Sequence, residues 1–132
     1  ETLAGKLQTF AAAQRARFMG LNTASRHIVT YHKSLDYLIK WLGLELVAVV
    51  EPKPGIAPTP GHTAKVLKAM KSGSIRVLLQ ERHYPQSTSK TLCKLSGAQI
   101  VVIDGQTRFD AGQSYLDHMR EVTDALYAAL SR

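Results

Sequence analysis

A single cysteine, Cys93, occurs among the 132 residues of the chain. An internal disulfide is therefore excluded, and so is a zinc motif built from several cysteines. No apolar run approaches the roughly 20 residues that a membrane-spanning helix needs, and no basic segment followed by an apolar one opens the sequence. Because the chain begins at Glu1 and not at a methionine, we expect a fragment or a processed product.

The motifs of several common enzyme classes are also missing. Neither of the glycine-rich phosphate-binding patterns, GxGxxG and GxxxxGK[ST], occurs, and there is no GxSxG nucleophile elbow. Cys93 falls on the apolar side of an expected helix, which favours a place in the core over a role as nucleophile. No nucleophile and base can be paired, so we expect a protein that is not an enzyme.

Acidic residues are scarce relative to basic ones, with 10 against 17, a net charge of +7 and an isoelectric point near 9.8. Such a balance raises the possibility of nucleic-acid binding. Most of the basic residues, however, fall at one or two per expected element, and they form no stripe with aromatic residues between them. We expect a solvated surface and no nucleic-acid partner; a basic α/β interaction module stays as the alternative, to be tested by salt-dependent DNA binding.

Near-continuous apolar runs rich in β-branched residues alternate along the chain with helical patterns. Hydrophobic residues make up 45% of the sequence, which suits one globular domain. A long first helix has an apolar stripe that includes Leu3 and Phe18, and four of the five prolines lie in the loop 51–60. The expected strands are 26–31, 44–50, 75–80 and 98–103; helices are expected over about 2–21, 34–43, 59–73, 87–97 and from 114 to the end.

This order predicts an α/β fold. No hairpin dipeptide separates the strands, and apolar strands that alternate with amphipathic helices are typical of a parallel sheet buried on both faces. Right-handed crossovers then give a small doubly wound lobe, with a four-stranded parallel sheet flanked by helices and preceded by the long helix.

Polar residues of the metal-ligand type follow all four strands: His32, Glu51, Glu81 and Asp104. Because open parallel sheets bind ligands at the carboxyl ends of their strands, these side chains are candidates for one site. Structural roles are equally open at this stage. A histidine at a strand end can be a hydrogen-bonded structural residue, Glu81 can pair with Arg82, and Asp104 begins a good turn dipeptide.

Several segments resemble the metal-binding solute-binding proteins of ABC transporters, the zinc and manganese receptors with a rigid helix between two lobes. Ile28-Val-Thr-Tyr-His-Lys-Ser34 and Tyr37-Leu-Ile-Lys-Trp-Leu-Gly-Leu44 are similar to the "VTYH…YF…GL" segment of that family. The loop 51–60, the strand end Val77-Leu-Leu-Gln-Glu81 and the last helix from Ser114 resemble the segments that follow. The resemblance extends over nearly the whole chain, but only over the C-terminal lobe.

The resemblance implies a division into residues 1–22, the end of the inter-lobe helix, and residues 23–132, the C-terminal α/β lobe. His32 matches the histidine ligand of that lobe. Asp104 or Asp110 matches the further acidic ligand of the family, whereas Glu81 and Glu51 would support the ligands at the cleft.

The implied function is the capture of a divalent transition metal outside the cytoplasm, Zn²⁺ first and Mn²⁺ next, for delivery to an ABC permease. The chain would hold half of the metal site, with the N-terminal lobe of the same receptor and the permease as partners. The implied location is periplasmic or extracellular and membrane-anchored, in a bacterium. Since some members resemble surface adhesins, an adhesin without a transport role is the alternative.

Overall fold

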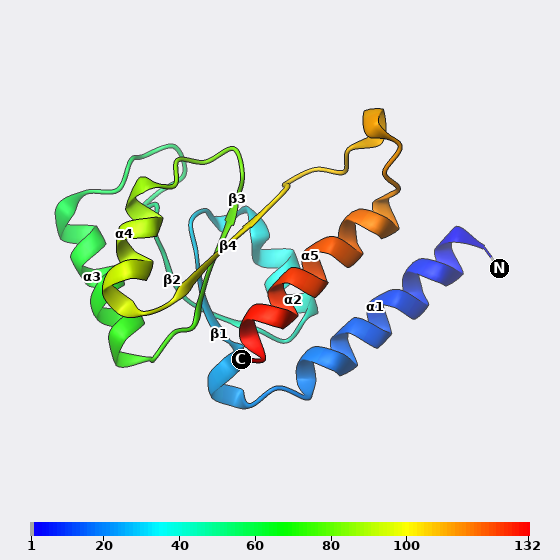
Figure 1. Cartoon of the computed structure of the whole chain (residues 1–132), viewed down its shortest axis with the longest axis horizontal. Helices are drawn as coiled ribbons and strands as arrows, with labels where there is room; N and C mark the ends of the chain where they lie inside the picture. Colours follow the sequence, from blue (N-terminus) through cyan, green and yellow to red (C-terminus); the bar gives the residue numbers. More distant parts are fainter. Residues whose placement is uncertain (1) are drawn as a thin grey trace.

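Four parallel strands form the centre of the molecule, in the spatial order β2-β1-β3-β4. The structure is a computed structural model that describes residues 2–132 (Figure 1). The strands are β1 (His27–Thr30), β2 (Glu45–Val49), β3 (Val77–Glu81) and β4 (Gln99–Ile103); the helices are α1 (Leu3–Met19), α2 (Asp36–Trp41), α3 (Pro60–Ser72), α4 (Ser87–Ser96) and α5 (Tyr115–Leu130); the 3₁₀ turns are η1 (Thr23–Arg26), η2 (Lys33–Leu35) and η3 (Phe109–Ala111).

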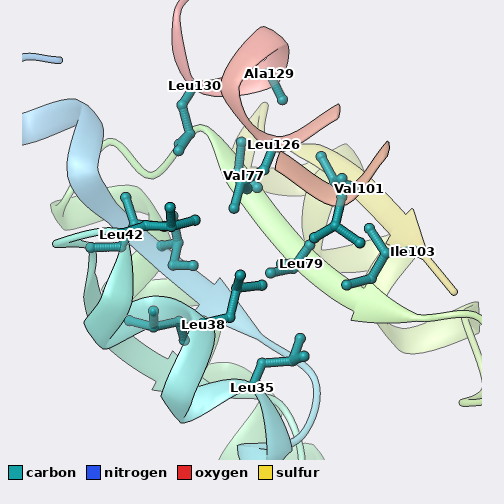
Figure 2. Close-up of a cluster of buried hydrophobic side chains, with 14 of the residues drawn as sticks. Leu35, Leu38, Leu42, Val77, Leu79, Val101, Ile103, Leu126, Ala129 and Leu130 are labelled. Carbon is teal, nitrogen blue, oxygen red and sulfur yellow. The ribbon is translucent and has the colours of Figure 1, made fainter. Parts of the chain in front are cut away.

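Helices cover both faces of the sheet, and the alternation of side chains along the strands builds a core on each face. On one face, Val77 and Leu79 of β3 pack with α1, α2 and α5 (Figure 2). On the other face, Leu78 packs with Val66 and Met70 of α3 and with α4. Strands with two buried faces have continuous apolar sequences, which explains the pattern seen in the chain. The parallel four-stranded sheet with helices on both faces confirms the predicted doubly wound α/β fold.

Local sequence signals account for several helix ends. The Thr59 hydroxyl accepts a hydrogen bond from the amide of His62 at 3.2 Å and caps α3, with Pro60 at its first position. Gly97 ends α4 in the left-handed conformation, and Gly43, with φ of +70°, follows α2. His62 lies in the first turn of α3, and its Nε2 contacts the Val49 carbonyl at 2.8 Å.

The predicted helix start at Ser34 is wrong. A 3₁₀ turn occupies residues 33–35, and α2 begins only at Asp36 with no side-chain cap. The Ser34 hydroxyl is used elsewhere, because it donates to the Glu81 carboxylate at 2.9 Å.

α1 is anchored to the lobe from Phe10 onward, since the Phe10 ring packs against Trp41 and the core. Of the predicted apolar stripe, Phe18 is buried, whereas Leu3 is 68% exposed. The Trp41 indole donates to the Ala11 carbonyl at 3.0 Å, and Arg15 donates to the Trp41 carbonyl at 2.8 Å. The first turns of α1 therefore extend past the sheet (Figure 1). Within residues 2–132, no helix combines the length and the apolar character that crossing a membrane requires.

Candidate metal centre

The carboxyl ends of β1 and β3 lie side by side at the middle of the sheet. The chain leaves β1 through α2, which packs on one face, and leaves β3 through α4, which packs on the other face. The two connections diverge at this point, and such a switch point is where open parallel sheets form their ligand crevices. The residues that follow β1 and β3 therefore meet at one place.

His32 is paired with a carboxylate there. Its Nδ1 lies 2.5 Å from Oε1 of Glu51, and the side chains are 18% and 9% exposed. A carboxylate accepts a hydrogen bond, so Nδ1 carries the proton and Nε2 presents its lone pair. No hydrogen bond within residues 2–132 involves this Nε2. A carboxylate that fixes the histidine tautomer in this way is the usual support of a metal-binding imidazole.

An irregularity in the sheet brings Glu51 opposite His32. The register of β1 and β2 shifts by one residue between Ile28 and Val29. Beyond this shift the ladder continues past the strands, because the amide of Glu51 donates to the Tyr31 carbonyl at 3.0 Å. Without the shift, Val50 would face His32.

One tyrosine stacks on the His32 ring, and a second tyrosine stacks on the first. Tyr84 stacks on His32 with ring centroids 5.0 Å apart and on Tyr31 at the same distance. Burial raises the pKa of the Tyr84 hydroxyl, and the carboxylates of Glu81 and Glu51 add to the effect. The Tyr84 ring thus stays neutral and covers one face of the imidazole.

The loop that carries Tyr84 is held by a buried glutamine. The amide nitrogen of Gln80 donates to the carbonyls of Tyr84 and Pro85 at 3.0 and 2.9 Å. Its oxygen accepts from the Ser89 hydroxyl at 2.6 Å, and both side chains are fully buried. All polar atoms of the Gln80 amide group are engaged in this network, which fixes the position of Tyr84.

Glu81 lines a neighbouring open cavity of about 380 Å³. Its carboxylate is largely buried and accepts from Ser34. Gly105 lies against it, since a Cβ at this position would come within 3.2 Å of Oε2 of Glu81. The cavity is lined by Glu81, Arg82, His83, Asp104, Gly105, Gln106 and Arg108. Glu81 and Asp104 therefore share one concavity, whereas His32 is not part of its lining.

Asp104 is occupied by two guanidinium groups. Nε of Arg82 lies 2.7 Å from Oδ1, and Nε of Arg108 lies 3.4 Å from Oδ2. The hydrogen bond from Arg82 and the charges of both arginines hold the pKa of Asp104 below its ordinary value. Its backbone carbonyl contacts Nε2 of the buried His118 at 2.7 Å. The carboxylate is thus ionised, and its negative charge is balanced by the two guanidinium groups.

Asp110 lies in a different setting, on the short turn η3. Its side chain is exposed, and the segment between β4 and α5 that carries it extends beyond the sheet (Figure 1). Within residues 2–132, no three side chains of histidine, cysteine, aspartate or glutamate come together as a possible set of metal ligands.

The family model described as "Zinc-uptake complex component A periplasmic" matches residues 1–129. The chain belongs to this family. The predicted resemblance to metal-binding solute-binding proteins is confirmed.

Three relatives illustrate the family. The high-affinity zinc uptake system protein ZnuA of Bacillus subtilis is 26% identical over 110 residues, which are 80% of this chain and 34% of the relative. The solute-binding protein FpvC of Pseudomonas aeruginosa, solved with Mn²⁺, is 29% identical with a TM-score of 0.75, over 97% of this chain and 48% of that one. The laminin-binding protein Lmb of Streptococcus agalactiae shares the fold at 18% identity and a TM-score of 0.79, over 96% and 49%. The chain thus spans less than half the length of these relatives.

The strand-end residues of this zinc-uptake family member, Glu51 among them, were predicted from the sequence, whereas the contacts of Ser34, Tyr84 and Gln80 were not. Ser34 was expected at the start of a helix, and Tyr84 and Gln80 had no assigned role. A signal for Tyr84 was present, because it follows β3 at the switch point, where residues after β1 must also lie. Nothing in the sequence indicated the register shift that pairs His32 with Glu51.

Proposed function

We propose that this chain supplies half of the binding site for a divalent transition metal, Zn²⁺ first and Mn²⁺ next, in a two-lobed receptor that delivers the ion to an ABC permease. The metal is the cargo of the receptor. His32 is the ligand that we assign to this lobe, through Nε2.

The pairing of His32 with Glu51 carries this proposal. The contact of 2.5 Å between Nδ1 and Oε1 orients the ring and leaves Nε2 for the ion. An imidazole nitrogen suits Zn²⁺ and the later first-row metals better than it suits Mg²⁺ or Ca²⁺. The exposed fraction of 18% of the His32 side chain leaves the ring reachable from the cleft.

A second ligand from this lobe comes from the segment after β4. Asp104 and Asp110 are the two candidates, and the ion pairs of Asp104 with Arg82 and Arg108 favour Asp110. To bind a metal, Asp104 would have to give up two charge-assisted contacts. Asp110 is exposed and has no ion pair within residues 2–132. Glu81, with its hydrogen bond from Ser34, supports the cleft wall.

The remaining ligands would come from an N-terminal lobe. A catalytic or structural zinc site needs at least three protein ligands, and one lobe offers one or two. The protruding start of α1, with Leu3 68% exposed, supports the assignment of residues 1–22 to the end of an inter-lobe helix; Glu1 lies outside the described residues. Residues 23–132 then form the C-terminal lobe, in a receptor that acts outside the cytoplasm, in the periplasm or anchored at the cell surface.

Titration calorimetry of the 132-residue chain with ZnCl₂ tests the proposal. We expect weak binding of one ion, with open coordination positions filled by water, and a loss of at least tenfold in affinity for His32→Ala. His27→Ala serves as the matched control, because His27 is a partly exposed histidine paired with Glu45 at the opposite, amino end of β1.

Equal losses in the two variants would assign the binding to nonspecific surface histidines and would refute the role of His32. Unchanged binding in His32→Ala would refute it as well.

A further inference from the structure

One stretch of the chain accounts for the net positive charge of the protein. Residues 52–98 contain eight basic residues and one acidic residue, Glu81, which together equal the net charge of +7. The rest of the sequence contains nine basic and nine acidic residues. Glu81 is buried, so no acidic side chain of this stretch balances the basic ones at the surface.

The fold concentrates this charge on one side of the molecule. α3 and α4 pack side by side over the same face of the sheet (Figure 1). Neither helix contains an aspartate or a glutamate. Their five lysines, all exposed, form what we call the lysine face: Lys65, Lys68, Lys71, Lys90 and Lys94.

The opposite side of the sheet is balanced. α1, α2 and α5 together contain five basic and four acidic residues. Some of these form ion pairs, such as Arg17 with Asp124 at 2.8 Å and Arg120 with Asp117 at 3.6 Å. By contrast, no ion pair within residues 2–132 involves a lysine. The positive charge of the lysine face is therefore not neutralised by the protein itself.

The residue types on this face indicate the kind of anionic partner. Neither α3 nor α4 contains an arginine, whose planar fork grips single phosphates in two places. Neither contains a phenylalanine, tyrosine or tryptophan on which a nucleic-acid base could stack. Lysines instead act as point charges on long stems, and Leu95, which follows Lys94 in α4, is 55% exposed. Several point charges with an apolar side chain suit the headgroup region of a lipid bilayer.

We propose that the lysine face binds the surface of an anionic phospholipid membrane. Each lysine within a Debye length of such a surface strengthens binding by about fivefold, so five of them make a substantial contact. The lysine face lies on the helices α3 and α4, which cover one face of the sheet. His32 and Glu51 lie instead at the carboxyl ends of the strands. Membrane contact would thus leave the candidate metal centre open. The inference rests on the proposed location outside the cytoplasm, beside a membrane.

Sedimentation with lipid vesicles tests this surface. We expect the chain to bind vesicles of phosphatidylcholine with about 30% phosphatidylglycerol at 50 mM NaCl, and to be released at 500 mM, where screening is stronger. Phosphatidylcholine alone should not bind. Lys90→Gln/Lys94→Gln should lower the partition coefficient at least tenfold. Lys6→Gln/Lys40→Gln is the matched control, since it removes two exposed lysines from the other side, and should change binding less than twofold.

Three outcomes would overturn the proposal. The first is no preference for the anionic vesicles. The second is an equal loss in the two double variants, which would make net charge and not the lysine face responsible. The third is tighter binding to heparin than to the vesicles at the same salt, which would assign the face to a polyanion. Zinc titration of Lys90→Gln/Lys94→Gln should match the unmodified chain, so a failure of this inference and a failure of the metal proposal are distinguishable.

Discussion

His32 and Glu51 show how one carboxylate defines the chemistry of a neighbouring side chain. Because Glu51 faces Nδ1 at 2.5 Å, the tautomer that presents Nε2 is selected before any ion arrives. Tyr84 stacks against the ring and limits its rotation. The imidazole is thus preorganised, and less conformational freedom is lost when a metal binds.

The role of Glu51 can be tested with the isosteric amide. We expect Glu51→Gln to lower the affinity of the chain for Zn²⁺ by about 10- to 100-fold, the usual effect of removing the partner of a metal-binding histidine. The measurement is calorimetric titration beside the unmodified chain. Glu45→Gln is the control, because Glu45 pairs with His27 at the other end of β1. An unchanged affinity in Glu51→Gln would mean that this carboxylate does not orient the ligand.

At the scale of elements, the connection from α2 to β2 shows why a glycine is required at one position. Gly43 has φ of +70°, and a Cβ there would lie 2.6 Å from the Met19 sulfur at the end of α1. An added Cβ would therefore displace the Met19 side chain, which is 47% exposed and free to move. The firmer constraint is the left-handed backbone of Gly43, which favours a residue without a Cβ.

Alanine substitutions at Gly43 and at Gly61 compare the effect on stability of a left-handed glycine with that of a glycine in an ordinary helical turn. Gly43→Ala should lower the free energy of unfolding by about 1–3 kcal/mol, through the left-handed backbone and the contact with Met19. Gly61→Ala, in the first turn of α3 with no neighbour near its Cβ, should be neutral or stabilising by up to about 1 kcal/mol. Urea denaturation monitored by circular dichroism measures both. A Gly43→Ala protein as stable as Gly61→Ala would contradict the assigned contact.

At the scale of the whole molecule, charge is distributed unevenly over two faces and one edge. The lysine face is purely positive, the face of α1, α2 and α5 is balanced, and the edge at the strand ends contains buried or paired carboxylates. Carboxylates that are paired in the folded state link its stability to pH. Asp104 is the one whose pKa is lowered by named partners, Arg82 before Arg108.

The sign of this pH dependence follows from the lowered pKa of Asp104. The folded state favours the ionised carboxylate, so its contribution is fully present above the unfolded pKa of about 3.9 and is lost as pH falls through the folded value. Asp104→Asn should therefore lower Tm by about 2–5 °C at pH 7, and the difference should disappear toward pH 2. Asp110→Asn, which removes an exposed carboxylate, is the control. A difference between Asp104→Asn and the unmodified chain that persists at pH 2 would point to a packing effect.

The sequence by itself determined the α/β class, the four parallel strands and the position of His32 at a strand end. These features depend on local patterns: apolar runs long enough for buried strands, helical periods between them, and glycine or threonine at helix ends. The family resemblance also follows from consecutive residues, as in Ile28–Ser34. Short segments of the sequence contain this information, so it can be obtained without knowing which residues are in contact.

Only the tertiary structure decided which side chains meet. His32 pairs with Glu51 because of a one-residue register shift between β1 and β2, and Ser34 reaches Glu81 across 47 positions. Asp104 is neutralised by Arg82 from the adjacent strand end. The lysines of α3 and α4, spread at two or three per helix in the sequence, form one face because both crossovers lie on the same side of the sheet. Strand register and the side of each crossover arise from long-range packing, which no short window of sequence contains.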